Sequence, residues 1–146
     1  MSRTLSPRLA LPVALVVALV SGCSSPASAD GASFSGSPFA SFTTDGGKLH
    51  VDLRTAPDQP PSRGVENVEL VVHDESGAAV SGLTIDVVPW MPAMGHGASL
   101  QPRVEAAGEG RYVVSDVHFF MPGDWQLRLT FSGPVEDHAA PVLQIP

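Results

Sequence analysis

Sulfur and imidazole side chains gather in two short segments of this sequence. These segments are residues 89–97 (PWMPAMGHG) and residues 118–124 (HFFMPGD). Thioether sulfur is a soft metal ligand and imidazole a borderline one, so together, without thiolate, they suit Cu(I) best, whereas carboxylate-rich sites suit Mg²⁺ or Ca²⁺. The two segments therefore indicate a candidate copper site.

The order of the strands predicts that both segments lie at the same end of the molecule. If the strand 83–88 runs upward, the loop 89–100 lies at the top and the strand 101–106 runs down again. The turn at Gly108-Glu109-Gly110 then lies at the bottom, and the strand from Arg111 returns the chain to the top near Met121. This assignment of the two segments to one end requires that the chain continue through Ser115-Asp116 without a turn.

We expect Met94, His96 and Met121 to be the metal ligands, in an open coordination that permits transfer of the metal. Met91 is the first candidate for a further ligand and His118 the next, although a histidine at such a position is more often an ordinary strand residue. Zinc is disfavoured because it takes Cys, His or carboxylate, and only one or two histidines are near enough.

Trp90 is expected to lie over this site and to shield it from water and oxidant. Two less specific interpretations stay open. The methionine-rich loops could form an exposed apolar patch that contacts another protein, and His96, between two glycines, could be an ordinary surface histidine. Trp125 is expected in the core of the domain.

The rest of the pattern predicts an all-β fold. Apolar residues alternate with polar ones at a period of two, and Gly- and Asp-containing turns separate the runs. Fourteen Gly and fourteen Pro argue against long helices. We expect an immunoglobulin-like antiparallel β-sandwich of seven to eight strands, with clear runs at 49–54, 68–73, 83–88 and 125–131 and weaker ones at 111–114 and 141–145.

The first 22 residues have the features of a secretory signal peptide. Arg3 and Arg8 precede the apolar run 9–20, which is shorter than the roughly 20 residues that a membrane helix needs. The run ends in Val20-Ser21-Gly22-Cys23, which resembles the lipobox of bacterial lipoproteins. The alternative is an ordinary signal with an incidental cysteine.

Lipidation of Cys23, the single cysteine of the chain, would leave no thiol and would anchor the protein to a membrane outside the cytoplasm. In a Gram-negative cell this would be the periplasmic side of one of the two membranes. The expected organisation is a signal peptide at 1–22, the lipidated cysteine with a flexible Ser-, Ala- and Gly-rich tether at 23–38, and a folded domain at 39–146.

Enzymes and nucleic-acid binders are disfavoured. The sequence has no G-x-S-x-G, H-E-x-x-H or P-loop motif. Its eight Lys and Arg residues do not cluster, and its formal net charge is −7, so it is a poor match for a phosphate backbone. We expect a binding protein without catalysis.

The site segments also resemble a known family. The chain resembles the YtkA-like domain, close to the FixH type, in the order of its motifs. These are M-P-x-M-x-H at 91–96, Pro102, G-x-Y at 110–112, M-x-G-x-W at 121–125 and Leu127. The resemblance extends from Val65 to Phe131.

This resemblance implies a small exported or membrane-anchored β-sandwich protein associated with copper handling and with assembly of haem–copper oxidases. It implies Met94, His96 and Met121 as ligands, with Met91 in the same motif, while His118 is not part of the pattern. FixH proteins have a transmembrane anchor, whereas this chain has a lipidation signal.

The sequence as a whole therefore predicts a Cu(I) carrier or buffer, a metallochaperone that serves a copper-receiving membrane protein. The alternative is a metal-free protein–protein interaction module of the cell envelope.

Overall fold

The computed structural model describes residues 32–146, which form only β-strands, turns and loops. The expected signal peptide, Cys23 and most of the expected tether lie outside the described residues. The strands are β1 (Ala40–Thr43), β2 (Leu49–Ala56), β3 (Gly64–Asp74), β4 (Thr84–Met91), β5 (His96–Gly97), β6 (Arg103–Gly108), β7 (Arg111–Phe119), β8 (Gly123–Ser132), β9 (Asp137–Ala139) and β10 (Val142–Ile145).

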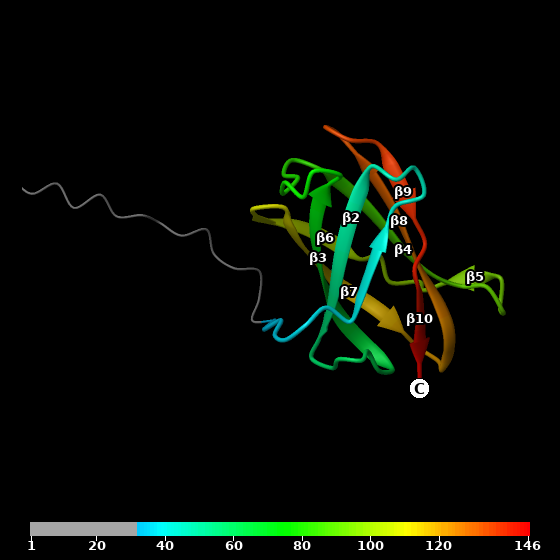
Figure 1. The fold of residues 1–146 in the computed structure, drawn as a ribbon. Coiled ribbons are helices and arrows are strands. Elements are labelled where there is room, and N and C mark those ends of the chain that lie inside the picture. Colours follow the sequence, from blue (N-terminus) through cyan, green and yellow to red (C-terminus); the bar gives the residue numbers. More distant parts are fainter. Residues whose placement is uncertain (1–31) are drawn as a thin grey trace, which may run out of the picture.

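The strands form two antiparallel sheets that pack as a β-sandwich (Figure 1). One sheet has the order β1-β2-β3-β7-β6 and the other β10-β8-β4-β5, with β9 paired to β8. The predicted β-sandwich is confirmed. The described part of the chain contains ten strands rather than seven or eight, because β1, β5 and β9 are too short, at four, two and three residues, to show an alternating pattern.

The core lies between the sheets and consists of the inward side chains of each alternating run. Trp125 is fully buried, as the sequence predicts, and packs edge-on against Phe119 with ring centroids 5.5 Å apart. Tyr112 is also buried, and its hydroxyl donates to the Val80 carbonyl oxygen and accepts from the Leu83 amide. These two hydrogen bonds satisfy the buried hydroxyl, while the ring of Tyr112 adds apolar surface to the core.

Both site segments begin inside strands, not at the loop positions that the sequence suggested. β4 continues through Pro89 to Met91, and β7 continues through His118 to Phe119. The Pro89 carbonyl oxygen accepts from the Ala98 amide, so it points away from β8. The N–H and C=O of a strand residue point to the same side, so the N–H that proline lacks would not have paired with β8. Proline is therefore tolerated at this position.

The chain passes Ser115 and Asp116 without a turn. Asp116 has φ of +64°, and the register of β7 against β3 shifts there in a β-bulge. A bulge adds one unpaired residue and bends the strand but does not reverse it. The strand order therefore carries Met121 to the same end as the end of β4.

Several connections meet at this end of the sandwich, which we call the loop end. It comprises the β2–β3 loop (57–63), the β7–β8 turn (120–122) and the C-terminal end of β10 (Figure 1). We include the β4–β5 turn (92–95), which projects to the side of the sandwich and whose hairpin contacts the β7–β8 turn through the His96 and Phe120 rings. The described residues contain no helix long and apolar enough to cross a bilayer.

Candidate metal site at the loop end

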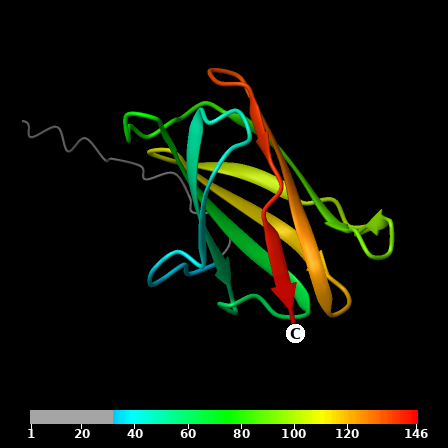
Figure 2. The ribbon, with the colours of Figure 1, turned by 45° about the vertical axis from the view of Figure 1, so that its right-hand side comes forward.

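The β4–β5 hairpin is a tight turn that projects from the body of the sandwich (Figures 1 and 2). The amides of Met94 and Gly95 both donate to the Met91 carbonyl oxygen, at 3.1 and 3.0 Å. Gly95 has φ of +68°, a conformation that favours glycine. The turn places the Met94 side chain at the tip of the hairpin, where it is 53% exposed.

Met91 and His96 are direct cross-strand partners in this hairpin. Side chains of paired residues project on the same face of a sheet, so both point toward the interior side. Met91 ends the inward alternation of β4 and is only 5% exposed, so it belongs to the core. His96 lies beyond the core boundary and is exposed.

The His96 ring lies against the β7–β8 turn. Its plane is nearly parallel to that of Phe120, with ring centroids 5.8 Å apart and an interplanar angle of 8°. His96 Nδ1 lies 3.3 Å from the Gly97 carbonyl oxygen. A carbonyl oxygen only accepts, so this contact favours the tautomer with the proton on Nδ1 and leaves Nε2 free to bind a metal.

The β7–β8 turn is fixed from below by Trp125. The Trp125 indole Nε1 donates to the Met121 carbonyl oxygen at 3.0 Å. The Trp125 and Phe120 rings meet edge-on, with centroids 4.9 Å apart. Met121 is partly buried and packs against the core. Segments that are far apart in the sequence therefore meet through the His96–Phe120 contact and the Trp125 support.

Two other predicted site residues are placed differently from the ligand set. His118 is half-buried in β7, pairs with Val65 and contacts Phe120 edge-on at 6.0 Å. Trp90 projects from the face of the sheet opposite to Met91, where the Arg128 guanidinium lies 4.3 Å from its ring centroid. That position does not support the expected role of Trp90 as a shield over His96.

The donor set at the loop end is poor in charged ligands. Within residues 32–146 no three His, Cys, Asp or Glu side chains gather into a metal-binding group. The two segments that meet through His96 and Phe120 carry instead the thioethers of Met94 and Met121 and the imidazole of His96. A neutral, thioether-rich set of this kind fits Cu(I) and not Mg²⁺, Ca²⁺ or a closed zinc site.

Sequence reasoning missed Phe120, which contacts His96, His118 and Trp125. A phenylalanine that follows another one at a strand end gives no signal by its type alone. The only available clue was its position beside Met121, in a turn that should bring it to the rim.

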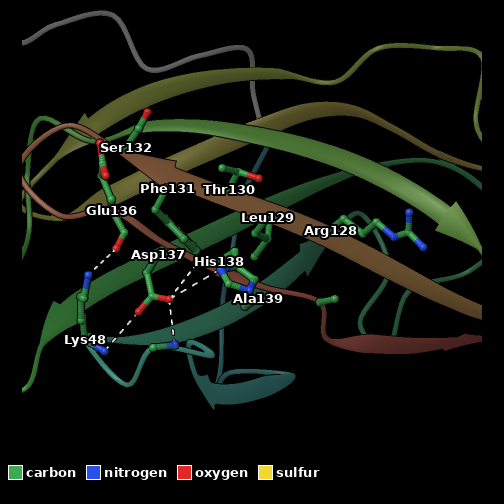
Figure 3. A pocket seen from close by; sticks show the side chains of 12 residues that line it. Lys48, Arg128, Leu129, Thr130, Phe131, Ser132, Glu136, Asp137, His138 and Ala139 are labelled. Carbon is green, nitrogen blue, oxygen red and sulfur yellow. Dashed lines mark hydrogen bonds and ion pairs between the residues drawn. The ribbon is translucent and has the colours of Figure 1, made fainter.

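A pocket lies at the opposite end of the sandwich, along β8 and β9 (Figure 3). Its buried carboxylate, Asp137, is already paired. Asp137 accepts from the Thr44 hydroxyl and from the amides of Gly46, Lys48 and His138. Burial acts to raise the pKa of Asp137, but these four donors outweigh it and hold the pKa well below its usual range. Asp137 is therefore a structural support of the β1–β2 turn.

A second buried carboxylate, Glu66, lies on β3 beside the loop end. One of its oxygens accepts from the Ser62 amide at 3.1 Å, while Oε2 has no hydrogen-bond partner. Burial raises the pKa of Glu66. Its contact with Ser62 holds the β2–β3 loop.

The fold and the site together define an all-β sandwich that carries methionine and histidine side chains at its loop end. The YtkA-like family model matches residues 45–130, which is more than half of the chain. The chain therefore belongs to the YtkA-like family, as the motifs of its two site segments predicted. Comparisons with curated proteins and with solved structures found no match.

Proposed function

We propose that this protein is a membrane-anchored, extracytoplasmic Cu(I)-binding protein that acts as a copper carrier or buffer. The observation that supports this most directly is the contact of His96 with Phe120, because it brings the β4–β5 hairpin to the turn that contains Met121. The resemblance to the FixH type extends the proposal to delivery of copper to a membrane protein during haem–copper oxidase assembly.

In this proposal Met94, His96 Nε2 and Met121 bind the metal. Met94 is exposed at the hairpin tip and can accept copper from solution or from a partner. Met91 is buried, so it would join the ligand set only if its side chain moved outward. Three neutral ligands leave a coordination position open, which favours transfer to a site with more ligands.

Copper retention tests this function. The purified full-length chain is mixed with Cu(I) under anaerobic conditions in the presence of bicinchoninate as a competing chelator. We expect the chain to retain about one equivalent, in line with a single site formed by Met94, His96 and Met121. The double variant Met94→Ala/Met121→Ala should lose it. His138→Ala, which changes an exposed histidine at the opposite end, should retain it. Copper retained by the double variant would remove the site as proposed.

A second function is favoured by the exposed apolar side chains at and beside the loop end. Met94, Phe120 and Val65 are 53%, 38% and 51% exposed. Such a surface suits a metal-free interaction module of the cell envelope. That function predicts no retained Cu(I). It also predicts that a photo-crosslinker at position 94 forms one adduct with a membrane protein whether or not copper is present.

The membrane anchor is a separate part of the proposal, because Cys23 lies outside the described residues. Cys23→Ser should release the protein from the membrane fraction into the extracytoplasmic soluble fraction. If the variant stays in the membrane fraction to the same extent as the wild type, lipidation of Cys23 is not what holds the protein there.

A further inference from the structure

We propose that Phe120 is a positioning residue of the copper site, which holds the His96 imidazole in the orientation that binds the metal. This inference rests on the proposed function and names a residue outside the ligand set. It is carried by the geometry of three aromatic rings at the loop end, those of Trp125, Phe120 and His96.

His96 has little other support from the fold. It belongs to a strand of two residues, β5, whose register with β4 consists of two residue pairs. Within residues 32–146, the one hydrogen-bond contact of its side chain is the 3.3 Å approach of Nδ1 to the Gly97 carbonyl oxygen, in the same strand. A side chain on such a short projecting hairpin would otherwise sample several rotamers.

Phe120 provides a rigid surface for this ring. Its own ring rests edge-on against the fully buried Trp125 at 4.9 Å, and Trp125 in turn holds the turn through the Met121 carbonyl oxygen. The nearly parallel His96 ring then lies 5.8 Å away. The order Trp125, Phe120, His96 therefore connects the core to the expected ligand.

Two consequences follow for the metal. The Phe120 ring covers one face of the imidazole, so rotation of His96 about its side-chain bonds is restricted. The same contact holds the hairpin against the β7–β8 turn and so fixes the separation of His96 from Met121. Groups that orient a ligand in this way affect metal affinity without touching the metal.

The test uses Phe120→Leu, which keeps an apolar side chain and removes the flat ring. Without copper, we expect the ring-proton NMR resonances of His96 to move toward values of an exposed histidine, because the ring current of Phe120 is lost. With Cu(I) and bicinchoninate as competitor, we expect the affinity to fall by about 10- to 100-fold, the usual effect of losing a group that orients a ligand.

Two further variants separate positioning from general damage. Phe120→Tyr retains the ring and should restore both the His96 resonances and the Cu(I) affinity. Leu100→Ala changes a residue that is 40% exposed, close to the 38% of Phe120, and should alter neither.

The outcomes distinguish the two proposals. Unchanged His96 resonances in Phe120→Leu would overturn the positioning role, whatever the copper result. Moved resonances with an unchanged Cu(I) affinity would overturn it as well. A wild-type chain that retains no Cu(I), with resonances that move in Phe120→Leu and return in Phe120→Tyr, would refute the copper function and leave the ring contact established.

Discussion

Met91 lies directly against Gly123, so that a β-carbon at position 123 would stand 2.7 Å from Met91 Cε. Gly123 opens β8 and follows the turn that contains Met121. The glycine therefore creates the space in which the last buried side chain of β4 packs beneath the rim. This contact ties the end of β4 to the β7–β8 turn from the core side, while His96 and Phe120 do so from outside.

Gly123→Ala should destabilise the protein through this contact. Its φ of +130° is unfavourable for alanine, and the added methyl group must also displace Met91. Gly64 has the same φ, and a β-carbon added there would have no atom within 4 Å, so Gly64→Ala measures the backbone strain alone. We expect Gly123→Ala to cost about 1 kcal/mol more than Gly64→Ala in chemical denaturation, a modest excess because the methionine side chain is flexible. Equal costs would contradict the packing described.

The alternating runs allowed the sequence to predict most of the fold. The run around Trp125 shows the period of two clearly, and its inward residues form the core. β7 was only partly recognised, because the bulge at Asp116 separates the buried Val114 and Val117 by three residues instead of two. A local insertion of this kind hides the second half of a strand from a search for period two.

The candidate site was predicted at the level of loops and not of side chains. Strand order alone brings the hairpin and the Met121 turn to one end. It cannot say that Met91 is core while Met94 is exposed, because that depends on where β4 stops alternating. Strand order likewise could not show that Trp90 projects on the face of the sheet opposite to Met91 and His96, because this depends on which residues of β4 and β5 pair.

Asp137→Asn should destabilise the opposite end of the sandwich. The carboxylate accepts four hydrogen bonds, and the amide replaces one accepting oxygen with a donor that faces other donors. We expect a loss of about 3 kcal/mol in free energy of unfolding at neutral pH. Asp45→Asn, which removes an exposed pairing with His138, should change it by less than about 0.5 kcal/mol.

The pH dependence gives this substitution a second readout. Because the pKa of Asp137 is lowered by folding, its contribution to stability is present above the unfolded pKa of about 3.9 and is lost as the pH falls below it. Wild-type stability should therefore decrease more steeply below pH 4 than that of Asp137→Asn. Parallel curves would show that the carboxylate is not held as described.

Glu66→Gln should have the opposite effect on stability. Since folding raises the pKa of Glu66, the wild type is favoured while this group is protonated and loses stability as the pH rises above the unfolded value of about 4.3. The glutamine keeps an acceptor for the Ser62 amide and carries no charge. We expect it to stabilise the protein by about 1 kcal/mol at pH 7, measured by denaturant unfolding, with little effect near pH 3.

Glu69→Gln is the matched control for that experiment. Glu69 is equally buried on the same strand, but its carboxylate is paired with the guanidinium groups of Arg54 and Arg111. Removing its charge leaves two arginines without their partner, so this variant should be less stable than the wild type at pH 7. A stabilising Glu69→Gln together with a destabilising Glu66→Gln would reverse the assignment of the two carboxylates.

Hydrogen peroxide should distinguish the methionines of the described domain by their exposure. Peroxide converts a thioether to a sulfoxide and is itself reduced to water, and its rate at each site depends on access to the sulfur. Met94 is 53% exposed, Met121 is partly buried and Met91 is 5% exposed. We expect sulfoxide to appear in that order in peptide mass spectra of the folded chain, and at equal rates after unfolding.

Bound Cu(I) should slow the oxidation of Met94 if its sulfur is a ligand, since the lone pair that attacks peroxide is then shared with the metal. Early oxidation of Met91 in the folded chain would mean that the end of β4 opens readily and that Met91 is available to the site.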